Sequence, residues 1–228
     1  MNANWTIGFD GDDTLWHNES IFSMTQERFR AILGGIDADE IDRRLLETER
    51  RNLGLFGYGI KGFVLSMIET AIEVTDGRVE ARDIQTLIEA GKSMLAHPVD
   101  LLDGVAETVE YLSHSHRLVL VTKGDLFDQE SKIARSGLAE LFDRIEIVSE
   151  KDPETYRRIL ARHGIAPDRF LMVGNSVRSD VLPVLEIGGR AVHVPYHITW
   201  AHEHVEPPAE GYRRIDGMAE LTGVVAGL

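Results

Sequence analysis

The sequence contains no cysteine, which excludes a disulfide framework, a thiolate metal site and a cysteine nucleophile. It is also poor in basic residues, because 38 Asp and Glu outnumber 24 Lys and Arg and give a formal net charge of −14. Sequence-independent binding to a phosphate backbone requires clustered Lys and Arg. We therefore expect no nucleic-acid partner, and any anionic substrate would need a local cationic site.

Long hydrophobic runs are absent too. No stretch approaches the ~18 uninterrupted apolar residues that span a bilayer, and the N-terminus lacks the basic segment and apolar run of a signal peptide. We therefore expect a cytoplasmic protein without a membrane partner. A chain of 228 residues can build one large core, or a core domain that carries a smaller inserted domain.

A short apolar run near the N-terminus ends abruptly at three carboxylates. Residues 5–9 read Trp-Thr-Ile-Gly-Phe and are followed by Asp10, Asp12 and Asp13. Such a run is typical of a central strand in a parallel sheet, and open α/β sheets bind ligands at the carboxyl ends of their strands. Crowded carboxylates there require a cation or a raised pKa. Taken alone, the motif is equally compatible with a solvated acidic turn.

Helical periodicity follows from Ile21 to about Pro98 and predicts an all-helical insertion. One helix is expected to begin near Asp37 or Asp39. The stretch Gly54–Gly62 is too rich in glycine for a packed helix. We expect a connection there, either a simple inter-helix turn or a mobile loop that faces a substrate.

Strands and helices alternate after Asp103. Strands are expected at residues 117–121, 145–148, 170–173 and 191–194, and Pro153 is suited to the first turn of a helix. Ser179 is a candidate cap for the helix that contains Pro183. Repeated strand–helix units predict an α/β fold, a Rossmann-like doubly wound parallel sheet with helices on both faces.

Polar side chains follow four of the predicted strands. They are Asp10 and Asp12, then Thr122, then Lys151, then Asn175 and Asp180. The carboxyl ends of parallel strands meet at one edge, where a doubly wound sheet has its site. Acids combined with a lysine and a hydroxyl are suited to a hard cation that holds a phosphate.

These residues resemble the four motifs of the haloacid dehalogenase-like (HAD) hydrolase superfamily. Asp10-Gly-Asp12-Asp13-Thr14 is similar to the first motif, Thr122 to the second, Lys151 to the third, and Gly174-Asn175-Ser176 with Asp180 to the fourth. The helical insertion between the first two motifs looks like a C1-type cap. The resemblance implies a core domain of residues 1–16 and 98–228, and a helical cap domain of residues 17–97 that closes over the site and selects the substrate.

Two positions depart from the family pattern. Asp13 stands where glycine is common and adds a charge whose partner the sequence does not identify. Asn175 stands where a magnesium-binding Asp is usual. An amide oxygen can still bind Mg²⁺ but supplies no negative charge, so either the affinity is lower or Asp180 compensates.

The resemblance implies a Mg²⁺-dependent phosphatase that acts on a small phosphorylated metabolite. Asp10 would attack phosphorus and form an aspartyl-phosphate, and Asp12 would serve as acid and then as base. Mg²⁺ would be held by Asp10, the Asp12 backbone carbonyl and Asn175. Thr122 and Lys151 would hold the transferring oxygens, and Asp180 would orient Lys151 or a metal-bound water.

Two alternatives stay open. A phosphotransferase or mutase of the same superfamily uses the same nucleophile, and a catalytically silent HAD-like binding module would fit Asn175 and Asp13. Asp12 argues against a metal-independent dehalogenase. The histidines between residues 193 and 204 have no familiar zinc spacing, so we expect a surface segment or an oligomer contact there. We expect a monomer or homodimer.

Overall fold

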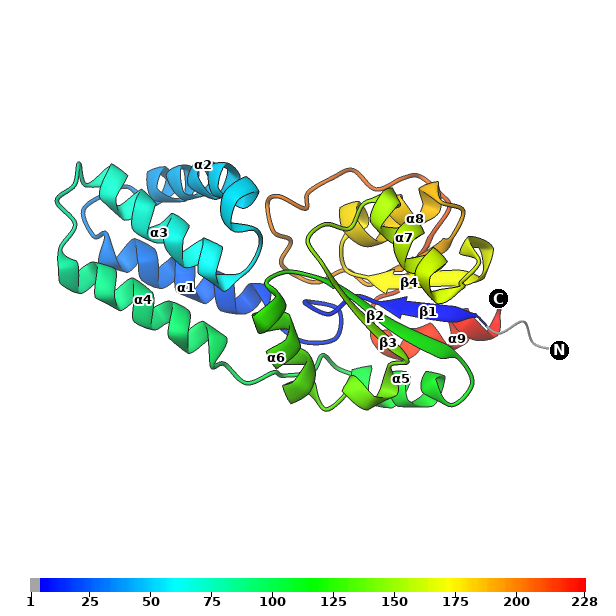
Figure 1. Cartoon of the computed structure of the whole chain (residues 1–228). Coiled ribbons are helices and arrows are strands. Elements are labelled where there is room, and N and C mark those ends of the chain that lie inside the picture. Colours follow the sequence, from blue (N-terminus) through cyan, green and yellow to red (C-terminus); the bar gives the residue numbers. More distant parts are fainter. Residues whose placement is uncertain (1–4) are drawn as a thin grey trace. The chain divides into compact units, whose positions relative to one another are not determined.

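The computed structural model describes residues 5–228, which divide into two compact units (Figure 1). The first comprises the chain up to Glu19 together with Val99–Leu228, and the second is Ser20–Pro98. The sequence analysis expected the first part of the core to end at residue 16, and in the structure it ends at residue 19. The second part was expected to begin at residue 98, and it begins at residue 99.

A six-stranded parallel sheet forms the centre of the first unit, with the strand order β3-β2-β1-β4-β5-β6. The strands are β1 (Thr6–Phe9), β2 (Arg117–Lys123), β3 (Arg144–Val148), β4 (Phe170–Gly174), β5 (Arg190–His193) and β6 (Arg213–Arg214). The predicted doubly wound parallel sheet is confirmed. The two-residue strand β6 was not predicted, because so short a strand shows no periodicity.

Helices cover both faces of the sheet (Figure 1). The apolar side chains of the strands alternate between two clusters, one on each face. One cluster joins Phe9, Leu120 and Val173 to the helices α5 (Val105–Ser113), α6 (Leu126–Ser136) and α9 (Leu221–Ala226). The other joins Val121 and Met172 to α7 (Pro153–His163) and α8 (Leu182–Glu186). Neighbouring residues of a strand point to opposite faces. Because helices cover both faces at the centre of the sheet, the central strands β1, β2 and β4 are buried over nearly their whole length.

The chain leaves and re-enters the first unit at two adjacent points. The backbone N–H of His17 donates to the Asp100 carbonyl at 3.0 Å, and that of Leu102 donates to the Leu15 carbonyl at 3.0 Å. The two ends of the helical insertion are therefore held side by side within the first unit.

The second unit consists of four helices around its own core. They are α1 (Glu19–Ile32), α2 (Ala38–Phe56), α3 (Ile60–Val74) and α4 (Ala81–Leu95), and their buried residues include Phe29, Leu45, Met67 and Leu87. Helix α2 begins where the sequence predicted, because the Asp37 carboxylate accepts a hydrogen bond from the Glu40 N–H at 3.1 Å. None of the helices within residues 5–228 is both long enough and apolar enough to cross a membrane.

The expectation of an irregular connection over Gly54–Gly62 is wrong at both ends. Helix α2 continues through Gly54, and the connection comprises only residues 57–59. Its two outer glycines have φ of +72° and +109°, which favour glycine. Gly62 is helical and buried, and a Cβ there would lie 2.9 Å from the Gly57 carbonyl oxygen. Close packing of the turn therefore explains this glycine.

We predict opposite effects for alanine at two helical glycines of the second unit. A Cβ at Gly91 of α4 would lie 2.5 Å from Cγ2 of Val64, whereas at Gly54 of α2 no described atom beyond its own helix backbone and chain neighbours lies within 4 Å. Gly91→Ala should destabilise the unit by ~1–3 kcal/mol through overpacking. Gly54→Ala should stabilise it by up to ~1 kcal/mol, because alanine is the better helix former.

Thermal unfolding followed by far-UV circular dichroism measures both variants against the unsubstituted protein. Equal unfolding midpoints for Gly91→Ala and Gly54→Ala would contradict the packing described for α3 and α4.

Candidate active site

The loop after β1 carries the three carboxylates, and Gly11 allows it to close. A Cβ at Gly11 would lie 2.7 Å from the Trp16 ring and 3.1 Å from Oγ1 of Thr122. The Asp10 N–H donates to the Val173 carbonyl of β4 at 2.9 Å, which extends the pairing of β1 by one residue. The loop therefore starts from a position fixed by the sheet.

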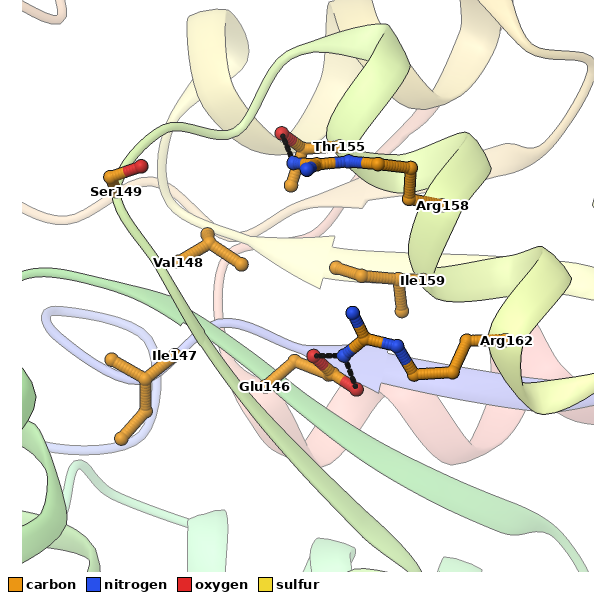
Figure 2. Close-up of a pocket in the computed structure, with 8 residues that line it drawn as sticks. All are labelled: Glu146, Ile147, Val148, Ser149, Thr155, Arg158, Ile159 and Arg162. Atoms are coloured by element: carbon orange, nitrogen blue, oxygen red, sulfur yellow. Dashed lines mark hydrogen bonds and ion pairs between the residues drawn. The ribbon is translucent and has the colours of Figure 1, made fainter.

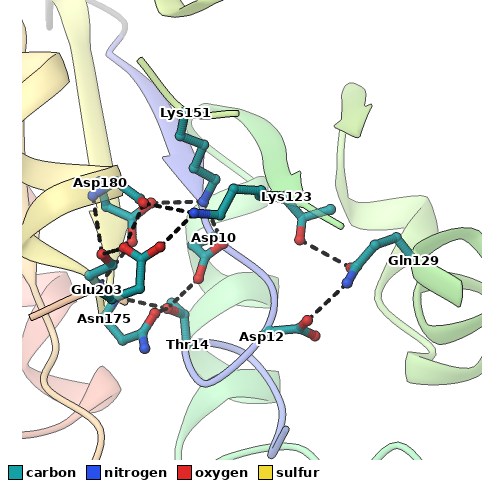
Figure 3. Close-up of polar contacts among 12 residues, drawn as sticks. Asp10, Asp12, Thr14, Lys123, Gln129, Lys151, Asn175, Asp180 and Glu203 are labelled. Atoms are coloured by element: carbon teal, nitrogen blue, oxygen red, sulfur yellow. Dashed lines mark hydrogen bonds and ion pairs between the residues drawn. The ribbon is translucent and has the colours of Figure 1, made fainter. Parts of the chain in front are cut away.

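Lys151 lies buried between two carboxylates (Figure 3). Its Nζ is 2.5 Å from Oδ1 of Asp10 and 2.7 Å from Oδ1 of Asp180. Burial acts to lower the pKa of Lys151, but the two carboxylates outweigh it and raise the pKa above its ordinary value, so the ammonium stays charged. Burial raises the pKa of Asp10 to about 7, and Lys151 opposes this rise. When both carboxyl groups are ionised, they leave an excess of negative charge around the one ammonium.

Asp180 is delivered by one wide, π-helical turn, Val177–Val181, which follows β4. Oδ2 of Asp180 accepts from the Ser176 N–H at 3.0 Å, and Ser176 Oγ accepts from the Ser179 N–H at 3.1 Å. The cap is therefore Ser176, and the expectation that Ser179 caps this segment is wrong, because the helical turn begins three residues earlier. A side chain at Gly174 would overlap the Asp180 carboxylate.

Thr14 connects Asp10 to Asn175. Its Oγ1 lies 3.1 Å from Oδ2 of Asp10 and 3.3 Å from Oδ1 of Asn175, and it accepts the Asn175 N–H at 3.0 Å. A hydroxyl has one proton, so it cannot donate to both oxygens at once. The backbone carbonyl oxygen of Asn175 accepts a hydrogen bond from Nε2 of His193 at 2.9 Å, so this ring nitrogen carries the proton.

The oxygens around Thr14 fit a hard cation such as Mg²⁺ in type. A carboxylate oxygen of Asp10 and the amide oxygen of Asn175 approach the same hydroxyl, which can donate to one of them at a time. Across residues 5–228 no group of three or more His, Cys, Asp or Glu is arranged to hold a metal ion. A magnesium ion here would depend on the amide and on a backbone carbonyl, such as that of Asp12.

The Asp12 carboxylate points away from Asp10 and toward Gln129 of α6 (Figure 3), and side chains of its own loop and of α6 bind it. Its Oδ1 accepts from Nε1 of Trp16 at 2.7 Å, and its Oδ2 accepts from Nε2 of Gln129 at 2.8 Å. Nζ of Lys132 lies 3.0 and 3.1 Å from the two oxygens. Oγ1 of Thr122 donates to Oε1 of Gln129 at 3.0 Å, so one amide connects Thr122 to Asp12.

The sequence did not identify Gln129 or Lys132 as site residues. Lys132 also donates to Oδ1 of Asn18 at 2.7 Å and lies 3.3 Å from Oδ2 of Asp128. Burial acts to lower the pKa of Lys132, but Asp12 and Asp128 raise it above the ordinary value. Their spacing is the sequence signal that could have identified them. Gln129 and Lys132 are three residues apart, so they lie on one face of the helix that follows the Thr122 motif.

Asp13 binds the start of α1. Its Oδ1 accepts the backbone N–H groups of Asn18 and Glu19 at 2.9 Å each, and its Oδ2 accepts that of Glu19 at 3.1 Å. Burial raises the pKa of Asp13 to about 7, and these N–H groups act to lower it. Its φ of +60° lies in the left-handed region, which explains why glycine is suited to this position. The partner of this charge is therefore backbone, not substrate.

Glu203, from the segment after β5, is a further acid at the strand ends that the sequence did not indicate. Its carboxylate accepts from Nζ of Lys123 and from Oγ of Ser176, each at 2.5 Å, and from Oγ of Ser179 at 2.7 Å. Burial acts to raise the pKa of Glu203, but Lys123 and the serine hydroxyls lower it to about 2.

The histidine-containing segment 193–204 is attached to the edge of the sheet by contacts of this kind. Beside Glu203, the guanidinium of Arg178 donates to the His202 carbonyl at 2.5 Å, and Nδ1 of His17 lies 2.7 Å from the Tyr196 hydroxyl. Hydrogen bonds, an ion pair and a ring contact between His17 and Tyr196 therefore hold this segment to the rest of the first unit.

A cavity of about 240 Å³ lies elsewhere in the first unit, between β3 and α7 (Figure 2). Its lining includes Arg162, which binds Glu146 at 2.9 and 3.1 Å, and Arg158, which binds Oγ1 of Thr155 at 3.0 Å. None of the site residues expected from the sequence lines this cavity. The candidate site lies instead at the carboxyl ends of β1, β2, β3 and β4.

Comparison with known proteins identifies relatives of the whole core. The haloacid dehalogenase-like hydrolase family matches residues 6–188. A crystal structure of a haloacid dehalogenase-like family hydrolase from Xanthomonas campestris is 47% identical, with a TM-score of 0.89 over 100% of this chain and 93% of that one.

Two curated relatives match part of the chain. The glyceraldehyde 3-phosphate phosphatase of Methanothermobacter thermautotrophicus is 28% identical over 123 residues, 51% of this chain and 54% of that protein. The phosphoserine phosphatase of Thermus thermophilus is 32% identical over 97 residues, 39% of each protein. The chain thus spans about half or less of the length of these two relatives.

We predict that two substitutions of Asp13 distinguish the stability contributed by its hydrogen bonds from the stability lost through its strained backbone conformation. Asp13→Ala loses the bonds to the start of α1 and keeps φ at +60°, so it should cost about 2 kcal/mol of unfolding free energy. Asp13→Gly loses the same bonds but relieves the strain, so it should cost less. Urea unfolding followed by tryptophan fluorescence reports on this unit, because Trp5, Trp16 and Trp200 all belong to it. Equal losses of unfolding free energy for the two variants would show that the positive φ of Asp13 causes no strain.

A second prediction concerns pH. Because the folded-state pKa of Glu203 is lowered to about 2, its carboxylate stabilises the protein fully above its unfolded pKa, and this contribution is lost as the pH falls through about 2. Glu203→Gln should therefore lower the unfolding free energy at pH 7, by at most ~3 kcal/mol. The difference in unfolding free energy between this variant and the unsubstituted protein should become progressively smaller below pH ~4.5.

The measurement is urea unfolding at several pH values, with Glu206→Gln, an exposed acid of the same segment, as the matched control. A loss that does not change with pH would show that the ion pair with Lys123 is not its cause.

Proposed function

Because the chain belongs to the haloacid dehalogenase-like hydrolase family, we propose that it is a phosphatase that hydrolyses a small phosphoric monoester through an aspartyl-phosphate on Asp10. The observation that carries this proposal is the buried Lys151 between Asp10 and Asp180, at the carboxyl edge of the sheet. The phosphatase names of the two partial relatives support a small phosphorylated metabolite as substrate.

In the proposed mechanism a carboxylate oxygen of Asp10 attacks phosphorus in line with the leaving oxygen, so the new P–O bond forms as the ester P–O bond breaks. Asp12 enters this step protonated and gives its proton to the leaving oxygen, and it recovers a proton from the water that hydrolyses the aspartyl-phosphate. Lys151 and Thr122 hold the transferring oxygens. Asp180 keeps Lys151 in place, since its carboxylate lies 2.7 Å from the ammonium.

Asp10, Asn175 and the backbone carbonyl of Asp12 would hold Mg²⁺, which supplies positive charge that lets an anionic phosphate approach carboxylates. Charge supports this part of the proposal. Lys151 faces two carboxylates, and Lys132 faces Asp12 and Asp128, so the lysines do not neutralise the acids around them.

We further propose that the helical unit Ser20–Pro98 acts as a C1-type cap that excludes water and selects the substrate. Its place in the chain, between the Asp10 loop and the Thr122 strand, supports this role, as does its separate core. A cytoplasmic location and a monomeric or homodimeric state stay predictions.

Phosphate release from a panel of phosphorylated metabolites, with and without Mg²⁺, tests the proposal. We predict that Mg²⁺ is required, that Asp10→Asn abolishes release, and that Lys151→Met lowers kcat by about 10²–10³-fold because a preorganised charge is lost. Asp168→Asn, which changes an exposed acid of the same unit, is the matched control and should leave activity unchanged.

Release that survives Asp10→Asn, or that needs no metal, contradicts the mechanism. Transfer to an added alcohol at the expense of phosphate release would identify a phosphotransferase. Absence of turnover together with absence of BeF₃⁻ binding would identify a silent binding module.

A further inference from the structure

We propose that Glu203 is a positioning residue for the magnesium site. It binds the hydroxyls of Ser176 and Ser179. These serines fix the turn between Asn175 and Asp180, so the segment after β5 contributes to the affinity for Mg²⁺. This inference rests on the proposed function, in which Asn175 binds the metal ion.

Glu203 lies in the connection from β5 to β6 and reaches back to the carboxyl edge of the sheet. Its side chain is 13% exposed. Figure 3 shows it directed toward Lys123, the last residue of β2. Ser176 and Ser179 belong to the turn that follows β4. One carboxylate thus joins the segment after β5 to the ends of two strands whose positions the sheet fixes.

The two oxygens of Glu203 have different partners. Oε2 accepts from the hydroxyls of Ser176 and Ser179 at 2.5 and 2.7 Å, and Oε1 accepts from Nζ of Lys123 at 2.5 Å. A carboxylate has only acceptors, so each hydroxyl must direct its single proton at it. The Ser176 oxygen then accepts the Ser179 N–H at 3.1 Å. Glu203 therefore sets the orientation of the hydroxyl that caps the turn.

The turn connects the candidate metal ligand to the carboxylate beside Lys151. The Asp180 N–H donates to the Ser176 carbonyl at 2.8 Å, and the Ser176 N–H donates to Oδ2 of Asp180 at 3.0 Å. Both bonds involve the backbone of Ser176, which directly follows Asn175. A displacement of Ser176 therefore moves both the amide that would bind Mg²⁺ and the carboxylate that holds Lys151.

The position of a ligand matters more at Asn175 than it would at a carboxylate. An amide binds a cation through its dipole and supplies no net charge, so its contribution to affinity depends on where its oxygen points. Residues that orient a metal ligand without touching the metal typically contribute about 10–100-fold to metal affinity. Glu203 orients Asn175 in this way, through Ser176.

Two substitutions of Glu203 separate positioning from charge. In Glu203→Gln the amide oxygen can still accept both serine hydroxyls, because these share Oε2, and only the ion pair with Lys123 is lost. In Glu203→Ala the serine bonds are lost as well. Both variants remove the same negative charge, so a loss of Mg²⁺ affinity caused by charge alone should be equal in the two.

The experiment is isothermal titration calorimetry of the full chain with Mg²⁺ alone. We expect Glu203→Ala to raise the dissociation constant by about 10-fold or more, and Glu203→Gln to raise it by less than about 3-fold. A merely structural role would lower the stability of both variants without this difference in affinity.

Glu146→Gln is the matched control. The Glu146 side chain is also 13% exposed, and the substitution removes its ion pair with Arg162, but Glu146 lines the cavity between β3 and α7 and not the candidate site. The dissociation constant of Mg²⁺ should therefore equal that of the unsubstituted protein.

Equal losses of Mg²⁺ affinity in Glu203→Ala and Glu203→Gln would assign the effect to charge and overturn the inference. Unchanged affinity in both would overturn it too, and either result leaves the proposed function standing. An unsubstituted protein that binds no Mg²⁺ contradicts the proposed function itself. If Glu203→Ala fails to fold because Lys123 loses a buried partner, Lys123→Met/Glu203→Ala and Lys123→Met/Glu203→Gln decide by the same criterion, since neither contains that ammonium.

Discussion

The pairing of buried Lys151 with Asp10 and Asp180 is the interaction on which the candidate site depends. A buried ammonium is strongly destabilising unless carboxylates surround it, so the three residues must come together for the first unit to be stable. They come from the ends of β1, β3 and β4, and their meeting sets the geometry of the loops. The wide turn that carries Asp180 and the absence of a side chain at Gly174 follow from this constraint.

The same motif recurs twice at this edge of the sheet. Lys132 faces Asp12 and Asp128, and Lys123 faces Glu150 and Glu203. Each lysine is surrounded by more negative charge than it carries. This arrangement stabilises the lysines but makes the edge unfavourable for an anion, so a phosphate ester requires added positive charge there. The physical case for Mg²⁺ thus comes from the charge balance as much as from the type of ligand.

The three acids of the first loop have separate surroundings although they are close in sequence. Asp10 faces Lys151, Asp12 faces α6, and Asp13 binds the backbone at the start of α1. A reactive carboxylate and a structural one can therefore stand side by side. Asp13 looked like an additional site charge, yet its carboxylate binds backbone N–H groups as a helix cap does, and these bonds account for an acid at a position whose positive φ favours glycine.

The sequence by itself determined the parallel sheet, the helical insertion and the strand ends at which Asp10, Thr122, Lys151 and Asp180 lie, because apolar periodicity and turn residues are local properties. Only the tertiary structure decided that Gln129 and Lys132 bind Asp12 and that Glu203 binds Lys123, since these partners are 117, 120 and 80 residues apart in the chain. It also decided that Gly54 and Gly62 are helical, because tolerance of glycine depends on packing against neighbours that the sequence does not show. Local patterns specify elements, and contacts between distant residues specify the chemistry of a site.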